Sequence, residues 1–590
     1  LHLIISGFEE IRPTFMLRTS FETEPFEKFE IALRRFDLEE TGQICRAMAP
    51  DSTWTEKDIR NVYLQTEGNP FFIRQLLNAG LPVKDGKGII SNNPFVSVIE
   101  FSGKDERLFL EALAVEPDHA SMLNISKVLD ISPLQLSKIC ENIKNNALVK
   151  EKNNDEGDVI YYFTHVKIRE ALLANMSATR KQALHLKNIE VLEAGISPYQ
   201  YRKREIYSLL CFHSHEAGLE EKELYWRVME LKQHFKAAHE VFPTLADHDL
   251  MKYVPTLEDL DYTQTALEEA GRLMDRIVRV SGRKPEMMRI ERDLLILRGA
   301  MLWWSGKYED AEGALREGLE KAIKIGETEP VVEACVQICY LAIQNDDERR
   351  LSAFANRVYL LSIKDHLHKW MGVALRFKGI SAILKGEFGI AFKVLQMSTL
   401  LFEKLEEEGD SYTVCIVAAE HFRGDACLAE GKTREALSYY LTCISIGESI
   451  GIYRGLGLSL AKAAFCNILN GKYDDAEKLL QRMEKLYAIT HTEKSGGLQG
   501  GGIGYSLMGL LSAMKGEWDD AVCYYSLAQK FVSETGRPTW ETFLYWSKLS
   551  LYSIENIPED VSKKLFKKSP EWYRENLNEM KKKIGWKNDF

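Results

Sequence analysis

The stretch that decides the fold is Gly306-Lys-Tyr-Glu-Asp-Ala311, because the same pattern returns four times in the second half of the chain. In each copy an alanine stands five residues after a glycine, with an aromatic residue or a threonine between them. The copies begin at Gly306, Gly386, Gly431, Gly471 and Gly516, so successive glycines are 80, 45, 40 and 45 residues apart. A recurring period of this size is the sequence signature of a stacked repeat protein.

One member of the series is missing between Gly306 and Gly386, where the spacing equals two periods. Its expected place is Asn345-Asp346-Asp347-Glu348, and asparagine tolerates the left-handed turn that glycine otherwise provides. Apolar residues flank each turn at three- and four-residue steps, and no proline occurs from Val331 to Arg537. Each unit is therefore predicted to be a helix, a turn and a second helix, with the small alanine allowing the two helices to pack closely.

A single helical hairpin cannot bury its apolar face, so the units must stack. The prediction is a mostly α chain ending in a right-handed superhelix of tetratricopeptide-like repeats, with a period longer than the usual length of about 34 residues. An irregular earlier hairpin is expected over Tyr201–Val241, turning at Ala217-Gly218, and the tail Lys563–Phe590 is expected to be a solvated capping helix. The glycine-rich stretch Gly496–Gly504 follows a helix rather than a strand, which favours an inter-repeat loop over a dinucleotide site.

Composition and charge exclude several classes of protein. Of 590 residues, 45% are apolar and 28% charged, which excludes collagen-like and wholly disordered chains. The net charge of −11 makes non-specific nucleic-acid binding by the whole chain unfavourable. No run of apolar residues is long enough to span a bilayer, so no membrane partner is expected. The ten cysteines are scattered singly without a Cys-x-x-Cys pair, which predicts no disulfide or metal site and a reducing, cytoplasmic compartment.

The histidine pairs His213-Ser-His215 and His366-Leu-His368 could suggest a metal site. Residues two apart on a helix do not face each other, so metal binding by either pair is not expected. The sequence starts at Leu1 rather than Met and shows no signal peptide. This start suggests a fragment cut from a longer reading frame.

The first 195 residues lack the repeat. Pro13–Leu17 suits the end of a buried strand, and helices are expected over Phe36–Met48, capped near Asp37, and over Thr55–Leu77. Three further helices are expected, and then a strand, a turn and a strand. Three helices followed by a β-hairpin is the order of a winged helix. The ranges concerned are Lys104–Ala114, Leu123–Leu129, Pro133–Asn145, Ala147–Glu151, Asn153–Gly157 and Val159–Phe163.

The segment Thr66-Glu-Gly68-Asn69-Pro70-Phe-Phe-Ile73 resembles the STAND class of signal-transduction P-loop ATPases. That class carries a Gly-x-Pro element in a helical lid beside the nucleotide. Phe15-Met-Leu-Arg18 resembles the strand whose final arginine senses the phosphates, and Phe36–Thr41 resembles the opening of the lid. Phe163-Thr-His165 with Leu184-His185 resembles the end of the internal winged helix. A long repeat array is also typical of bacterial regulators of this class, including the maltose-regulon activator type.

The resemblance implies a set of nucleotide-binding residues. Arg18 would contact the phosphates, Gly68, Asn69 and Pro70 would lie on the adenine side, and His165 would hydrogen-bond the β-phosphate of ADP. Each has a purely structural alternative: Gly68 and Pro70 could shape a helix start, His165 could cap the wing-to-helix junction, and Arg18 could lie on the surface. No catalytic residue and no metal ligand is predicted.

The sequence departs from the family because it has no GxxxxGK[ST] phosphate loop, and no apolar strand ending in paired acids, the usual magnesium site, precedes Phe15. The tripeptide Gly431-Lys432-Thr433 lies at a repeat turn and has Ala426 where the loop needs glycine. ATP or ADP, with Mg, could therefore bind only through a core outside this sequence, and the chain alone is not expected to hydrolyse ATP. The presumed recognition helix Pro133–Lys144 has two lysines and no arginine, so DNA contact by the winged helix is not expected.

These observations predict four parts: residues 1–30, the end of a P-loop core; 31–100, a helical lid; 101–195, a winged helix; and 196–590, the repeat superhelix. The favoured hypothesis is the C-terminal portion of a nucleotide-switched regulator, most simply a bacterial transcription activator. Its repeats would sense an inducer or a partner protein, self-association would accompany activation, and DNA would be bound only through a missing N-terminal domain. The alternatives are a non-enzymatic repeat scaffold and a switch coupled to a cyclase or kinase.

Overall fold

The computed structural model describes residues 35–50, 53–66, 68–70, 73–74, 77, 103–145, 148–154, 157–164, 166–196, 203–242, 258–407, 411–451, 455–489 and 500–587. The chain divides into two compact units, Leu1–Ala178 and Thr179–Phe590. The predicted strand Pro13–Leu17 lies outside the described residues. No helix of the described part is long and apolar enough to cross a membrane.

The first unit begins with two packed helices, α1 (Leu38–Met48) and α2 (Glu56–Thr66). The Asp37 side chain accepts a hydrogen bond from the Glu40 amide, and the Glu40 side chain accepts one from the Asp37 amide. This reciprocal cap fixes the start of α1 where the sequence predicts it. Cys45, Val62 and Ile73 form a small buried core between the helices.

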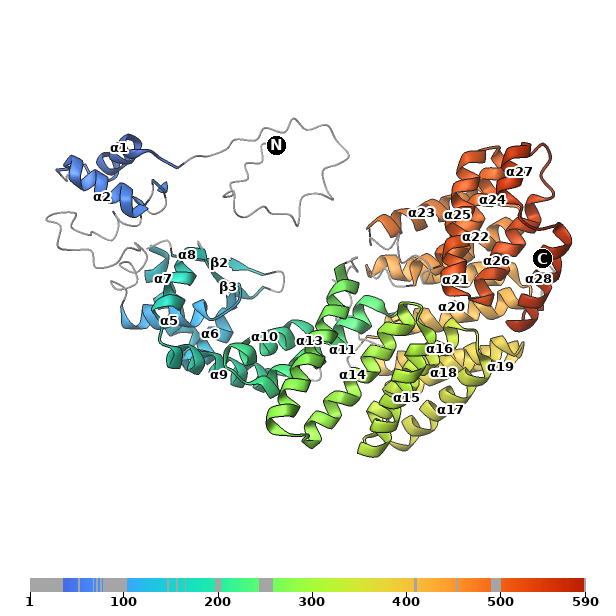
Figure 1. The fold of residues 1–590 in the computed structure, drawn as a ribbon, viewed down its shortest axis with the longest axis horizontal. Coiled ribbons are helices and arrows are strands. Elements are labelled where there is room, and N and C mark those ends of the chain that lie inside the picture. The colour runs from blue at the N-terminus through green and yellow to red at the C-terminus, as the bar shows by residue number, and fades with distance from the viewer. Residues whose placement is uncertain are drawn as a thin grey trace. The chain divides into compact units, whose positions relative to one another are not determined.

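Four helices and a three-stranded antiparallel sheet follow in the described part of the first unit (Figure 1). The hairpin strands pair from Val149 with Phe163 to Asn153 with Val159, as their alternating residues predict. The short first strand, which the sequence did not reveal, pairs with the last strand, giving the order β1-β3-β2. The elements are α5 (Lys104–Ala114), β1 (Ala120–Ser121), α6 (Met122–Leu129), α7 (Pro133–Asn145), β2 (Val149–Asn153), β3 (Val159–Phe163) and α8 (Val166–Asn175).

The second unit opens with the predicted irregular hairpin. Helices α10 (Lys203–Glu216) and α11 (Glu220–His239) pack against each other across a turn at Gly218, whose φ is 73°. Helix α9 (Ala178–Gly195) packs on α10 through His185, whose Nδ1 lies 2.9 Å from Nδ1 of His213. The unit therefore starts near residue 179, whereas the sequence-based boundary lies at 195/196.

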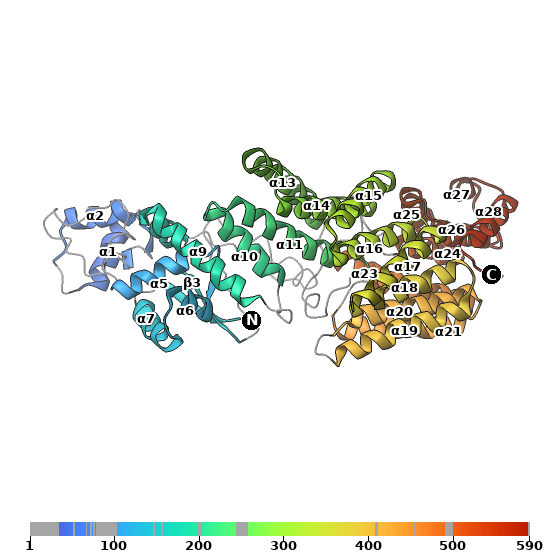
Figure 2. The same cartoon turned by 90° about the horizontal axis from the view of Figure 1, so that it is seen from below.

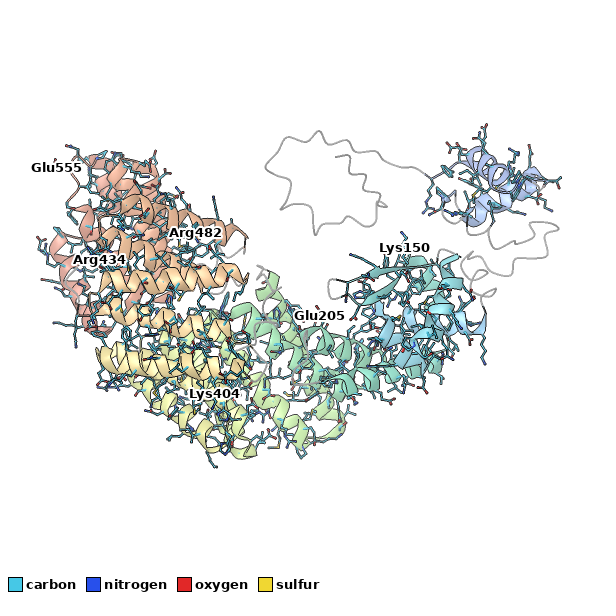
Figure 3. All side chains as sticks on the ribbon, turned by 180° about the vertical axis from the view of Figure 1, so that it is seen from behind. Lys150, Glu205, Lys404, Arg434, Arg482 and Glu555 are labelled. Atoms are coloured by element: carbon cyan, nitrogen blue, oxygen red, sulfur yellow. The ribbon has the colours of Figure 1, made fainter. Side chains whose placement is uncertain are left out.

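Paired helices build the rest of the second unit, as the period predicts (Figures 1 and 2). Within each pair the first helix is buried on nearly all sides, and the second is amphipathic. Lys404, Arg434 and Arg482, for example, point outward from second helices (Figure 3). The helices are α13 (Glu258–Ser281), α14 (Pro285–Trp304), α15 (Tyr308–Ile325), α16 (Thr328–Gln344), α17 (Glu348–Lys364), α18 (His368–Leu384), α19 (Phe388–Glu406), α20 (Thr413–Ala429), α21 (Thr433–Ser449), α22 (Leu456–Leu469), α23 (Tyr473–Ile489), α24 (Gly501–Lys515) and α25 (Trp518–Thr535).

The repeat pattern has the structural meaning that the sequence suggests. All five turn glycines have φ between 74° and 88°, a conformation in which a side chain is strained. The five alanines that follow are fully buried between the helices of a pair. At the missing member the expectation is wrong in detail: Asn345 has a φ of −95°, and Asp346 takes the left-handed conformation with a φ of 49°.

The glycine-rich stretch also differs from its prediction. Gly500 caps α24 with a φ of 93°, and Gly501, Gly502 and Gly504 lie inside this helix rather than in a loop. A Cβ atom at Gly502 would lie 3.2 Å from the Trp540 ring, and one at Gly504 would collide with Met483. The glycines thus allow α24 to approach its neighbours closely. Residues 496–499 lie outside the described part.

The C-terminal helices are α26 (Pro538–Leu551), α27 (Glu559–Leu565) and α28 (Pro570–Lys583). The tail is more than a solvated cap, because α28 packs on α26 and buries Tyr573, Leu577 and Met580. The residues after it reach back to earlier repeats. The Lys587 amide donates to the Ala429 carbonyl at 3.0 Å, and Lys587 Nζ donates to the Gly386 carbonyl at 2.9 Å.

Candidate ligand-binding site

A pocket lies among the inner helices of the second unit. Its volume is about 990 Å³, including the space that opens to solvent. Its walls come from α14, α16, α18, α20, α22 and α26, from the turn between α16 and α17, and from the segments after α11 and α28. The lining residues are Val241, Phe242, Trp303, Tyr340, Ile343, Gln344, Asp346, Arg376, Phe377, Ile380, Ile383, Leu384, Phe422, Asp425, Leu458, Lys462, Arg537, Thr539, Trp540, Ile584 and Trp586.

One wall is the short segment that follows α11. Phe242 packs its ring against His421 and Phe422, with ring centroids 5.5 and 5.9 Å away. Its carbonyl accepts a hydrogen bond from the Tyr340 hydroxyl at 3.3 Å. A Cβ atom at Gly455 would collide with the Phe242 ring. The segment is therefore seated in the inner face of the repeats by both packing and hydrogen bonding.

Another wall comes from the start of α26. Asp346 Oδ2 accepts hydrogen bonds from the Thr539 amide at 2.9 Å and from the Thr539 hydroxyl at 2.7 Å. Arg537 Nε lies 3.5 Å from Asp346 Oδ1. The left-handed turn at Asp346 aims this carboxylate at the first turn of α26, so the turn of one repeat holds a helix far along the chain.

A second acidic side chain in the wall is also fully engaged. Lys462 Nζ lies 2.7 Å from both oxygens of Asp425, and the Tyr440 hydroxyl donates to Asp425 Oδ1 at 2.6 Å. Burial alone would raise the pKa of Asp425, but the Lys462 charge and these hydrogen bonds outweigh it and lower the pKa. Burial and the nearby Lys462 lower the pKa of His421 to about 3, so this histidine is neutral at neutral pH.

Arg376, in the middle of α18, is the third cation of the wall. Only 1% of its surface is exposed. Nη2 donates to the Tyr340 hydroxyl at 3.3 Å, while Nη1 is buried and has no hydrogen-bond partner among the described residues. The Gln344 Oε1 atom, one turn beyond Tyr340 on α16, is likewise buried without a donor. Buried polar groups without partners are rare in folded proteins and call for an explanation.

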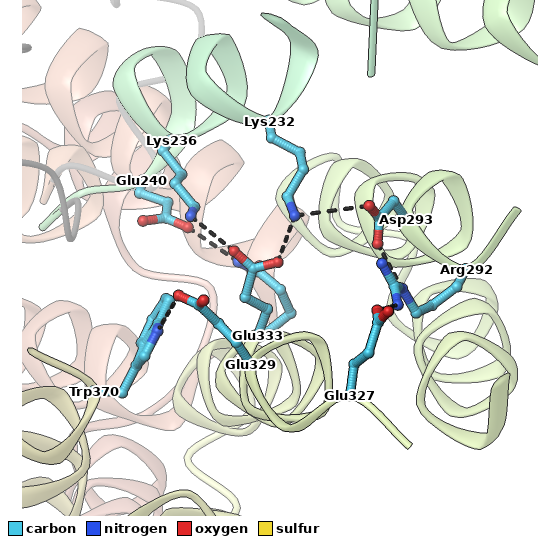
Figure 4. A network of polar contacts seen from close by, with 10 residues as sticks. Lys232, Lys236, Glu240, Arg292, Asp293, Glu327, Glu329, Glu333 and Trp370 are labelled. Carbon is cyan, nitrogen blue, oxygen red and sulfur yellow. Dashed lines mark hydrogen bonds and ion pairs between the residues drawn. The ribbon is translucent and has the colours of Figure 1, made fainter. Parts of the chain in front are cut away.

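A network of charges next to this pocket anchors α11 to the repeats (Figure 4). Glu333 lies between Lys232, at 2.7 Å, and Lys236, at 3.1 Å. Gln337 donates to Glu240 at 3.0 Å and accepts from the Trp303 indole at 3.1 Å. Burial opposes the charge of Glu333, but the two lysines outweigh it and hold the pKa of this carboxyl well below its usual range. The network fixes the helix that delivers Phe242 to the pocket.

The nucleotide-binding residues predicted from the sequence lie elsewhere. Arg18 and His165 are outside the described residues. Gly68 has a φ of 72°, its carbonyl accepts from the Phe36 amide at 2.8 Å, and a Cβ atom there would collide with the Phe36 backbone. The Asn69 amide donates to the Thr66 carbonyl at 2.9 Å, and Pro70 is exposed at a helical position. Gly68 therefore joins two helical segments.

The other sequence candidates lie in the repeat turns or on helix α10. The Gly431-Lys432-Thr433 tripeptide forms the turn between α20 and α21, as expected. His213 faces His185 while His215 pairs with Glu223 at 3.0 Å, so the two rings point to different neighbours. His366 lies in the left-handed turn before α18 rather than on a helix. Within the described residues, no group of histidine, cysteine and acidic side chains could hold a metal ion.

The sequence analysis did not predict that the lining residues form a pocket, although the sequence contains a signal for two of the charged ones. Arg376 and Lys462 each interrupt an apolar run inside an inner helix, in Val-Ala-Leu-Arg376-Phe and Leu-Ala-Lys462-Ala-Ala. A charge in a fully buried helix needs a partner or a function. Their convergence could not be read from the sequence, because it depends on how the repeats stack.

No family model and no curated protein sequence matches the chain. Among solved structures, it is similar to a STAND protein with a tetratricopeptide repeat sensor from Pyrococcus horikoshii. The TM-score is 0.53 at 13% identity, covering 93% of this chain and 74% of the other. A Rap protein complexed with the competence and sporulation factor matches with a TM-score of 0.45 at 14% identity, covering 69% of this chain and 94% of the other. The chain has a tetratricopeptide-like helical repeat fold.

Proposed function

We propose that the second unit is the ligand sensor of a nucleotide-switched signal-transduction regulator, with the ligand bound in the pocket around Arg376. The observation that carries this proposal is a pocket with aromatic walls whose lining includes a buried guanidinium, that of Arg376, with one nitrogen lacking a hydrogen-bond partner among the described residues. Binding sites for small molecules combine apolar walls with a few convergent polar groups in this way. The similar fold of a STAND protein with a repeat sensor supports the same proposal.

The first unit would then contain the moving parts. We propose that residues 1–30 are the end of a P-loop core, 31–100 a helical lid and 101–178 a winged helix, and that the sensor begins at residue 179, where the second unit starts, rather than at residue 196. The element order of three helices, a hairpin and a short third strand supports the winged-helix assignment. A sensor of this type works only if its ligand binds one of two states more tightly.

Nucleotide binding is proposed for the longer protein rather than for this chain alone. In the described part, the Gly68 carbonyl accepts a hydrogen bond from the Phe36 amide and the Asn69 amide donates to the Thr66 carbonyl, so both groups are engaged within the protein. Arg18 and His165 would supply the phosphate contacts, Gly68, Asn69 and Pro70 the adenine side, and a separate P-loop core the sites for ATP or ADP and Mg.

Output by transcription, through DNA binding in a missing N-terminal domain, stays part of this proposal. So do self-association on activation and a cytoplasmic location. In a chain that also carries the P-loop core, His165→Ala should weaken the retention of ADP during purification. Unchanged nucleotide occupancy would remove His165 from the site.

The sensor itself can be tested on the present chain. Ile380→Trp would fill the pocket, and Ile390→Trp is the matched control because Ile390 is 54% exposed on α19. Each protein would be incubated with a cell extract, and its bound small molecules analysed by native mass spectrometry. The wild type and the control should retain a compound that Ile380→Trp loses. Equal retention by all three proteins would contradict the pocket as the sensor site.

A repeat scaffold for protein partners is the second candidate. The outer helices α17 and α19 expose several large apolar side chains, among them Leu360, Met397 and Leu400, which are 50 to 66% exposed. Exposed apolar surface of this kind is typical of protein-interaction sites. A partner lost on Leu360→Lys but kept on Ile380→Trp would favour the scaffold.

A further inference from the structure

We propose that the ligand of the pocket carries a carboxylate, which binds Arg376, on an apolar or aromatic body. This inference rests on the sensor function proposed above and names the chemical class of its ligand. Its basis is the arrangement of charges in the pocket wall. Three cationic and two acidic side chains line the pocket, and they are not paired evenly.

The two acids already have their cations. Asp425 holds Lys462 through both oxygens at 2.7 Å. Asp346 lies 3.5 Å from Arg537 and accepts two hydrogen bonds from Thr539. Arg376 makes no ion pair with any described residue; its polar neighbour is the neutral Tyr340 hydroxyl. The wall therefore keeps one uncompensated positive charge.

The cost of this arrangement indicates a function. A buried charge without a counter-ion destabilises a protein strongly, and a buried unpaired donor adds its own desolvation cost. If Arg376 served only for packing, an apolar side chain could replace it without loss of stability. A guanidinium binds a carboxylate oxygen through a charge-assisted hydrogen bond, and Nη1 is the atom left for it.

The rest of the pocket defines the body of the ligand. Trp303, Phe377 and Trp540 supply aromatic walls, and Ile380 and Ile383 supply aliphatic ones. Gln344 Oε1 would accept a hydrogen bond from an N–H or O–H group of the ligand. A phosphate dianion would need more than the one lining cation, Arg376, that has no ion pair among the described residues, so a monoanion fits best. Small aromatic acids and the C-terminal carboxylates of short apolar peptides share this chemistry.

The decisive comparison uses acids and their neutral amides. The probes are 3-phenylpropionate and indole-3-acetate, each beside its primary amide, and apolar tripeptides with a free or an amidated C-terminus. Binding is followed by thermal shift and by the fluorescence of the tryptophans in the wall. We expect at least one acid to bind at least tenfold more tightly than its amide. Whether the aromatic acids or the peptides bind identifies the source of the carboxylate.

Arg376→Met removes the charge and the guanidinium while keeping an unbranched apolar side chain at this position. The matched control is Lys378→Met, on the same helix but outside the pocket. The preference for acids should disappear in Arg376→Met and persist in the control, and unliganded Arg376→Met should melt no lower than the wild type. If Arg376→Met fails to fold, Arg376→Gln and the acid–amide comparison on the wild type provide the same test.

The outcomes separate this inference from the proposed function. Equal binding of acids and amides, or an acid preference that survives Arg376→Met, would overturn the carboxylate assignment but leave the pocket as a sensor site. Failure of every acid to bind would also overturn it. The sensor function is decided independently by whether Ile380→Trp loses the compound that the wild type retains from extract.

Discussion

Gly379 of α18 lies directly beneath Leu395 of α19: a Cβ atom on Gly379 would be 2.5 Å from Leu395 Cγ. The same contact recurs at other turns, where a glycine seven residues before the turn glycine lies against a large side chain nine residues after it. The pairs are Gly299 with Leu315, Gly424 with Tyr440 and Gly509 with Tyr525. At the turn where Asp346 replaces the glycine, the residues at the same two positions are Cys339 and Ala355. Here the first residue is larger than glycine and the second is smaller than leucine or tyrosine. The two helices of each pair are thus fitted by complementary side-chain volumes.

This fit predicts the effect of Gly379→Ala. Overpacking a core costs about 1–3 kcal/mol, although alanine favours the helix by up to about 1 kcal/mol. We expect a net destabilisation in urea unfolding, and a smaller effect when Leu395→Val is added. Gly389→Ala is the control, because no atom lies within 4 Å of its Cβ position. The control should stabilise, and a stabilised Gly379→Ala would contradict the fit.

Asp346→Asn tests the contact between the α16–α17 turn and α26. Asparagine keeps the left-handed turn and can still accept one hydrogen bond, but it loses the charge that faces Arg537. We expect a loss of about 1–3 kcal/mol in the free energy of unfolding. Asp347 caps α17 through the Arg350 amide, and asparagine caps equally well, so Asp347→Asn should be neutral. Equal losses of stability in Asp346→Asn and Asp347→Asn would argue against a specific contact between Asp346 and α26.

Lys548 predicts a pH dependence. Burial, followed by the charge of Lys567, lowers the pKa of Lys548 to about 8, and its ammonium donates to the Leu565 carbonyl at 3.1 Å. In the unfolded chain this group keeps its proton until a pH of about 10.4. The unfolded state therefore binds more protons between these values, so stability should rise as pH increases from about 8 to about 10.

The matching experiment is urea unfolding of the wild type and of Lys548→Met from pH 7 to pH 10. The increase in stability that comes from Lys548 should be absent in Lys548→Met. The quantity to measure is therefore the difference in unfolding free energy between the two proteins at each pH. Lys563→Met serves as the control, because Lys563 is exposed and pairs with Glu559 on the same helix. A pH profile of Lys548→Met parallel to the wild type would show that Lys548 titrates normally.

Removal of the residues after α28 is expected to open the pocket. Ile584 and Trp586 line it, and Lys587 is tied to the Ala429 and Gly386 carbonyls. Truncation after Lys583 should lower the melting temperature and increase the quenching of Trp303 and Trp540 fluorescence by acrylamide. Truncation after Lys587 leaves all these contacts in place and should change neither quantity.

The parts of the fold that depend on local sequence were predictable. The glycine turns and buried alanines follow from the repeat period, and the start of α1 follows from the cap formed by Asp37 and Glu40. The pocket depends instead on contacts between residues far apart in the chain. No local pattern places Asp346 beside Thr539, and none shows that Arg376 would be left without an acid.

The return of the C-terminal residues also affects how the protein folds. In an open array each repeat contacts only its neighbours, so ends can unfold while the middle persists. Here hydrogen bonds join Asp346 to Thr539 across 193 residues and Gly386 to Lys587 across 201. Such ties raise the contact order, which slows folding. They also couple the repeats between Asp346 and Lys587, so that these repeats are expected to fold and unfold together rather than one at a time.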